Sequence, residues 1–110
     1  AGTDVQTADW TTGSLNVDTG LFIADAAISG LTATNIVDDV SSGIAAEIES
    51  QADDDFYLLV SNGTDAVLAR IADADDVFTS ADVTIVATLL GLSAADLQGL
   101  SASQFLDWIP

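Results

Sequence analysis

The sequence predicts a β-dominated α+β fold, in which an antiparallel, hairpin-rich sheet or sandwich carries one main helix over about residues 36–50 and short helical turns at the C-terminus. Two apolar runs flank a turn at 62–65, apolar residues recur at helical spacing over 36–50, and a β-branched run follows at 83–90. With 110 residues, 49% of them hydrophobic, the chain can build one modest core. We therefore expect a single domain over residues 1–110.

The first twenty residues are rich in Thr, Gly and Asp, with isolated apolar positions, a pattern typical of extended chain or short strands. Trp10 is the largest side chain of this segment. We expect it to hold the segment either in the core or on a neighbouring subunit. The next apolar run, at 21–30, ends at Gly30, and its periodicity is compatible with helix or strand.

A helix is expected over residues 36–50, because apolar residues fall at helical spacing and the acidic residues lie off that stripe. The stripe consists of Val37, Val40, Ile44 and Ile48. Thr34 or Asn35 would be the N-cap. Asp38 and Asp39 would then lie near the helix end whose dipole favours negative charge.

A β-hairpin is expected after the helix. Apolar runs at 56–60 and 66–71 flank the turn at 62–65, whose Asn-Gly-Thr-Asp sequence is typical of a hairpin connection. The run at 83–90 is rich in β-branched residues, which favours a buried strand. The edges of the strands at 56–60 and 83–90 are the parts expected to adhere to other copies.

The C-terminal part repeats the phrase Gly-Leu-Ser-Ala at Gly91 and at Gly99, and a related phrase starts at Gly30. Ser93 stands three residues before Asp96, and Ser101 three residues before Gln104. This spacing matches or resembles the capping box, in which two side chains satisfy the free N–H groups at a helix start. Both phrases therefore predict short helical turns. The inward-facing residues of these turns would be Leu97 and Phe105.

The charge balance is the most unusual property of the chain. Sixteen Asp and two Glu face the single basic residue Arg70, which gives a formal charge of −17. Such carboxylates repel one another or share bound cations, so we expect stability to depend on salt, pH and divalent metal. One basic residue makes no nucleic-acid footprint, and an anionic membrane surface would repel the chain. No apolar run approaches the roughly 20 residues that span a bilayer.

The residue types argue against an enzyme. The chain has no His, no Cys and no Lys, so a Ser or Thr nucleophile would lack a base. Paired carboxylates could serve a glycosidase, but such a small hydrolase would need a deep pocket that gathers two of them. We therefore expect no catalytic activity, and the sequence indicates no small-molecule substrate.

Acidic loops on either side of the hairpin are candidate calcium sites, because calcium takes six to eight oxygen ligands. The alternative is a pair of solvated acidic loops. Departures from the EF-hand pattern, such as Val77 in place of an acid and Phe78 in place of glycine, make this at best a degenerate relative. The candidate ligands are Asp73, Asp75, Asp76 and Asp82, with Asp53 and Asp55 from the loop before the hairpin.

Large apolar residues lie near both ends of the chain. They would either close the core or dock into a neighbouring copy, as an added strand does. These candidates for self-association are Trp10, Phe105, Trp108 and Ile109. Arg70, close to Asp65 and Asp73, would form an ion pair or cap backbone carbonyls, or else dock on an acidic patch of a neighbouring subunit. Asn62 fits a glycosylation sequon and equally a hairpin turn.

The C-terminal half resembles the C-terminal segments of bacterial RTX (hemolysin-type calcium-binding) exported proteins and their surface-layer relatives. Those segments run from strand to Asn/Asp-Gly-Thr-Asp turn, second strand, Asp-x-Asp loop, third strand and a Gly-Leu-Ser-Ala-x-x-Phe phrase. The glycine-rich nonapeptide of the calcium β-roll is missing here, so a repeated β-roll is not expected. The matching segments are 56–60, 62–65, 66–71, 73–76, 83–90 and 99–105.

The resemblance implies export by a type I system, folding on calcium outside the cell, and a surface role. An extreme halophile's cytosol is the rival location, although such proteins usually carry abundant Glu as well as Asp. Together with the charge, this predicts a secreted structural protein, calcium-dependent, that assembles with copies of itself into a filament or surface layer. The alternative is a monomeric export or adhesion module of a larger surface protein.

Overall fold

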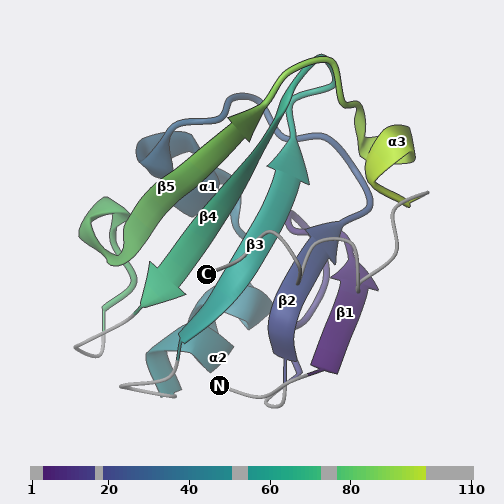
Figure 1. Ribbon diagram of the computed structural model, residues 1–110. Coiled ribbons are helices and arrows are strands. Elements are labelled where there is room, and N and C mark those ends of the chain that lie inside the picture. Colours follow the sequence, from purple (N-terminus) through teal and green to yellow (C-terminus); the bar gives the residue numbers. More distant parts are fainter. Residues whose placement is uncertain (1–3, 17–18, 51–54, 73–76, 99–110) are drawn as a thin grey trace.

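Five strands form one mixed sheet in the computed structural model, which describes residues 4–16, 19–50, 55–72 and 77–98 (Figure 1). The strands are β1 (Asp4–Ala8), β2 (Thr19–Ala24), β3 (Asp55–Ser61), β4 (Ala66–Ala72) and β5 (Val83–Leu89). They lie in sequence order across the sheet. β1, β2 and β3 are parallel neighbours, whereas β3, β4 and β5 are antiparallel neighbours. The predicted β-dominated α+β class is confirmed.

The expected hairpin is present as β3 and β4, whose register runs from Asp55 opposite Ala72 to Ser61 opposite Ala66. In its turn, the Asn62 side-chain oxygen accepts hydrogen bonds from the backbone N–H groups of Thr64 and Asp65, at 3.0 and 2.9 Å. Gly63 adopts a φ of +98°, a conformation that a residue without a Cβ reaches at little cost. The turn residues therefore fix the hairpin locally, as the sequence predicts.

Two helices, α1 (Ala33–Asp39) and α2 (Ser42–Ser50), stand where one helix over 36–50 was expected. The break falls at Ser41, whose hydroxyl accepts a hydrogen bond from the Ile44 N–H at 3.0 Å and so caps α2. The same hydroxyl donates to the Gly13 carbonyl at 2.7 Å, and the Ser41 N–H donates to the Trp10 carbonyl at 2.9 Å. The loop after β1 thus holds the chain at the break, and the uninterrupted helix was a wrong prediction.

The start of α1 also differs from the prediction. Thr32, rather than Thr34 or Asn35, is the N-cap, and its hydroxyl accepts from the Asn35 N–H at 3.1 Å. Because the helix begins and ends earlier than expected, Asp38 and Asp39 lie in its last turn, where the dipole disfavours negative charge.

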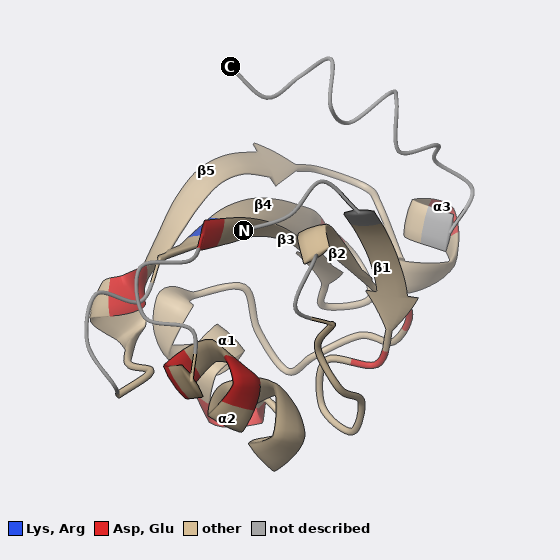
Figure 2. Ribbon diagram, turned by 90° about the horizontal axis from the view of Figure 1, so that it is seen from below, with Lys and Arg blue, Asp and Glu red and all other residues tan. Residues whose placement is uncertain are grey.

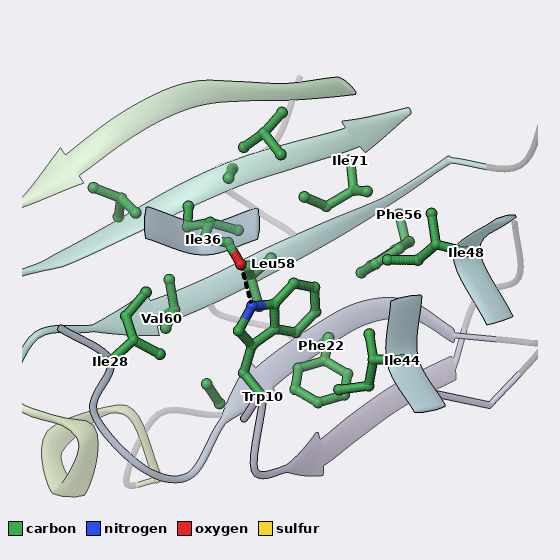
Figure 3. Packing of buried hydrophobic residues seen from close by; sticks show 14 of the residues in the cluster. Trp10, Phe22, Ile28, Ile36, Ile44, Ile48, Phe56, Leu58, Val60 and Ile71 are labelled. Atoms are coloured by element: carbon green, nitrogen blue, oxygen red, sulfur yellow. Dashed lines mark hydrogen bonds between the residues drawn. The ribbon is translucent and has the colours of Figure 1, made fainter. Parts of the chain in front are cut away.

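Helices α1 and α2 cover one face of the sheet, and the larger hydrophobic core lies between these helices and the sheet (Figures 2 and 3). Trp10 is fully buried at its centre, with its ring edge-on to Phe22 at 5.4 Å between centroids and tilted against Phe56 at 6.4 Å. Its indole N–H donates to the Ile36 carbonyl at 2.9 Å (Figure 3). Of the two alternatives for Trp10, the structure shows the one in which it closes the core of its own chain.

A smaller cluster lies on the opposite face of the sheet, where Leu97 of the short helix α3 (Ala94–Gln98) is fully buried. Ser93 and Asp96 form the predicted reciprocal capping pair. The Ser93 N–H donates to the Asp96 carboxylate at 2.9 Å, and the Asp96 N–H donates to the Ser93 hydroxyl at 3.2 Å. The second copy of the phrase, with Ser101, Gln104 and Phe105, lies outside the described residues.

Of the two strands whose edges are expected to be exposed, the one at 83–90 lies at an edge of the sheet and the one at 56–60 does not. β3 is the central strand of the sheet, so its edges are paired with β2 and β4 and are not open. β5 is an edge strand, and four of its seven residues are exposed: Thr84, Ile85, Val86 and Thr88. The prediction of a buried strand at 83–90 is therefore wrong. β-branched residues suit an edge strand as well as a buried one, because both are pleated surfaces.

Candidate functional site

Two acidic segments, residues 51–54 and 73–76, directly precede and directly follow the hairpin of β3 and β4 in the sequence. The loops themselves lie outside the described residues, but the residues that flank them are described. Asp55 directly follows the first loop and pairs with Ala72, which directly precedes the second. The described residues on the hairpin side of the two acidic segments therefore lie opposite one another at one end of the hairpin.

Described residues beyond the other ends of these two segments are also in contact. The Glu49 carboxylate, near the end of α2, accepts a hydrogen bond from the Phe78 N–H at 2.9 Å. Glu49 lies two residues before the first loop, and Phe78 lies two residues after the second. The residues that flank the two segments are therefore in contact on both sides. Asp55 and Ala72 pair between the strands, and Phe78 donates a hydrogen bond to Glu49.

Of the six predicted calcium ligands, Asp53, Asp73, Asp75 and Asp76 lie outside the described residues. Asp55 is bound to Arg70 by an ion pair. The Asp82 carboxylate accepts from the Thr79 N–H at 2.9 Å, at the start of the short 3₁₀ turn Ser80–Asp82 that leads into β5. Among the described residues, no three potential ligands gather at one point.

Arg70, the one basic side chain, extends from β4 toward Asp55 across the hairpin, and both side chains are close to half exposed. The sequence suggested Asp65 or Asp73 as its partner. In the antiparallel register Arg70 faces Tyr57, so that Asp55 is its diagonal neighbour, within reach of a long side chain. An exposed pair of this kind contributes at most about 1 kcal/mol.

Acidic side chains are distributed around the sheet. The Asp and Glu residues, red on the ribbon of Figure 2, lie on α1 and α2 and at the ends of strands, whereas β5 carries none. Two of them are held by local hydrogen bonds. Donation from the side chain and backbone of Thr11 lowers the pKa of Asp9, and donation from the side chain and backbone of Ser29 lowers the pKa of Asp39. These bonds stabilise the ionised forms.

The outer edge of β5 is the main exposed apolar feature on the sheet. Val86 is 44% exposed and Ile85 37%. Ile85 opposes Ala69 of β4 and Ala87 opposes Leu68, so Val86 between them is the extra residue of a β-bulge. Sequence reasoning placed adhesive edges on this run but missed these two residues. The sequence shows here an apolar run without charged residues. Such a run predicts neither which strand it pairs with nor where a bulge falls.

The remaining self-association candidates near the C-terminus, Phe105, Trp108 and Ile109, lie outside the described residues. Asn62 is exposed, and its side-chain oxygen is engaged by the turn described above. The turn therefore gives this residue a structural role, whether or not the sequon is used.

Comparisons with protein-family models, with curated proteins and with solved structures find no match for this chain. The resemblance to RTX-type segments thus stays a prediction from the sequence. None of the described helices is both long enough and apolar enough to cross a membrane.

Proposed function

We propose that this chain is a secreted, acidic structural protein that assembles with copies of itself into an extracellular filament or surface layer, and that calcium permits the assembly. The observation that carries the proposal is a sheet whose two edge strands have no outer partner among the described residues, in a chain whose charges, except one, are all negative. The open edges supply a means of contact, and the charge supplies a means of control.

The open edges are those of β1 and β5, at opposite sides of the sheet (Figure 1). In the described part of the chain, no strand pairs with either of them on its outer side. An edge strand presents unpaired N–H and C=O groups that can pair with a strand of another molecule. A protein with two such edges can join neighbours on both sides, as an extended assembly requires.

The charge opposes this contact until cations are present. Each copy carries −17, so two copies repel one another at low ionic strength. Monovalent salt screens this repulsion beyond about 8 Å at physiological ionic strength. A divalent ion can also bridge carboxylates. We propose that calcium binds at the two acidic segments, 51–54 and 73–76, whose flanking residues contact one another.

The alternative is a monomeric export or adhesion module of a larger RTX-like surface protein. The specific observation that favours it is the order of segments in the sequence at 56–90, which resembles that of the C-terminal segments of that class. The mass of the natural polypeptide separates the two proposals. A chain of this length favours the assembling protein, and a longer parent favours the module.

The proposal is tested on the full chain by light scattering and electron microscopy in calcium, in a chelator, and in sodium chloride of matched ionic strength. We expect large particles in calcium, smaller or fewer in sodium chloride, and monomers at low salt with chelator. If the chain stays monomeric at every calcium and salt concentration, the assembly proposal is wrong.

The role of the acidic loops is tested with the double variant Asp73→Asn/Asp75→Asn. The matched control is Asp25→Asn/Asp38→Asn, which removes the same charge from two exposed positions away from the loops. We expect the first variant to need more calcium for assembly than the control. An equal calcium requirement in both would show that calcium acts only by screening charge.

A further inference from the structure

We infer that β5 is the edge through which two copies associate, and that two β5 strands pair antiparallel to extend the sheet from one copy into the next. This inference rests on the proposed self-assembly and names the surface and the geometry of its primary contact. The partner is a second copy of this chain.

The composition of β5 favours pairing with another strand. Residues 83–89 contain no charged side chain and no proline, which are the usual means of protecting an edge. Within the described part of the chain, the bulge at Val86 is the protective feature of this edge, and regular strand lies on both sides of it. Since an approaching copy carries the same negative charge, the uncharged edge is the one where contact costs least.

The other open edge is less suited to the contact. β1 has five residues against seven in β5, and its first residue, Asp4, is a carboxylate. In an antiparallel pair of β1 strands the two Asp4 residues would be four residues apart along the strands, about 14 Å, which is closer than charged residues come in a β5 pair. We therefore assign the primary contact to β5.

The orientation follows from the position of Asp82, which directly precedes β5. In a parallel pair of β5 strands the two Asp82 residues would lie side by side at the same end. In an antiparallel pair centred on Val86, eight residues separate them along the strands, about 27 Å. Salt at physiological concentration screens most of the repulsion over that distance, whereas two adjacent carboxylates would still repel one another.

A contact between two seven-residue edges is small. It lies below the roughly 1,000 Å² expected of a permanent interface, so we expect association that is reversible and depends on protein concentration. Two-fold pairing of the same surface closes on itself, so the β5 contact alone gives a dimer, and growth beyond the dimer needs the second edge at β1.

The test uses one substitution at each edge of the full chain. Val86→Asp places a carboxylate on β5, and Val5→Asp places one on β1 at a valine of similar exposure, 44% against 39%. Both variants change the net charge equally, and circular dichroism checks that both fold. Sedimentation velocity over a range of concentrations in calcium then measures the dimer.

We expect Val86→Asp to weaken dimer formation at least tenfold relative to wild type, and Val5→Asp to leave it within about twofold, since interface charges without partners cost several kcal/mol and distant ones little. If both variants dimerise like wild type, the β5 assignment is wrong although self-assembly stands. Loss of the dimer in Val5→Asp alone would move the contact to β1. A wild type that never associates overturns both the assembly and this inference.

Orientation is tested with single cysteines, because the chain has none of its own. Disulfide formation needs Cα atoms within about 7 Å. Antiparallel pairing brings the two middle positions together and separates positions near the ends, about 14 Å for Thr84. Val86→Cys should therefore form a covalent dimer under mild oxidation, and Thr84→Cys should not. Equal cross-linking at both positions would show a parallel pair.

Discussion

At the scale of single residues, Trp10 carries more of the fold than any other side chain near the N-terminus. Its ring contacts Phe22 of β2 and Phe56 of β3, and its N–H reaches the backbone of α1 at Ile36. One residue in a loop thus joins the two parallel strands to the helical layer. The sequence indicated that Trp10 anchors the N-terminal segment, but not whether it packs in its own core or on a neighbouring subunit. Burial depends on contacts with residues distant in the sequence.

We expect Trp10→Phe to lower the free energy of unfolding by about 1–3 kcal/mol, because it leaves the buried Ile36 carbonyl without its donor. Urea unfolding followed by far-ultraviolet circular dichroism measures this. Leu90→Ala is the control, since Leu90 is 78% exposed and surface changes usually stay within about 0.5 kcal/mol. Equal effects of the two substitutions would contradict the role assigned to Trp10.

The Asp39 carboxylate gives a prediction for acid. It accepts from the Ser29 hydroxyl at 2.6 Å and from the Ser29 N–H at 2.9 Å, and these bonds lower its pKa below the ordinary 3.8. A lowered pKa contributes stability at pH values above 3.8 that is lost as the pH falls through the folded-state value.

Asp39→Asn should therefore be less stable than wild type at pH 7, and the difference should shrink below pH 3.8. Urea titrations at both pH values measure it. Asp38→Asn removes the same charge from the neighbouring exposed residue, without the bonds to Ser29. A pH-dependent loss of the same size in this control would show that charge alone, rather than the bonds, is responsible.

At the scale of elements, the repeated Gly-Leu-Ser/Thr-Ala phrase starts a helix in both places where it is described. Thr32 caps α1 and Ser93 caps α3. In each case the residue after the first turn, Ile36 or Leu97, is fully buried. The preceding leucines pack against the same clusters, which is the arrangement of a hydrophobic staple.

Removal of the first cap should be measurable. Thr32→Ala should destabilise the protein by about 1 kcal/mol, the usual cost of losing an N-cap side chain. Thr34→Ala is the matched control, because Thr34 is exposed in the first turn of the same helix and does not cap it. Equal stability of the two variants in urea unfolding would mean that the Thr32 bond contributes nothing.

Elements defined by neighbouring residues could be predicted, and those defined by distant contacts could not. The hairpin follows from its turn sequence and the start of α3 from Ser93 and Asp96. The break at Ser41 depends on bonds to the loop after β1, and the parallel pairing of β2 with β3 joins residues 36 positions apart at Leu21 and Tyr57. For the candidate site, the hairpin could be predicted, and its register brings Asp55 and Ala72, which flank the acidic segments, opposite one another. No local pattern distinguishes an edge strand from a central one.

At the scale of the whole molecule, the charge of −17 should make stability depend on ionic strength. Repulsions of about 0.2–1 kcal/mol per exposed pair add up, so we expect a gain of about 1–3 kcal/mol between low and high sodium chloride at pH 7. Urea midpoints measure the gain, and Asp25→Asn/Asp38→Asn should reduce it. Stability that does not change with salt would contradict this account.

The order of the strands also has a consequence for the route by which the chain folds. β3, β4 and β5 are antiparallel neighbours in sequence and need only short loop closures, whereas β2 must wait for the whole helical crossover before it can reach β3. We expect the C-terminal three strands to form first, which pulse-labelled hydrogen exchange would show as protection of Leu58 and Ala69 before Phe22. Until β2 pairs with β3, one edge of β3 is unpaired. Folding chains should therefore be most prone to aggregate in this interval.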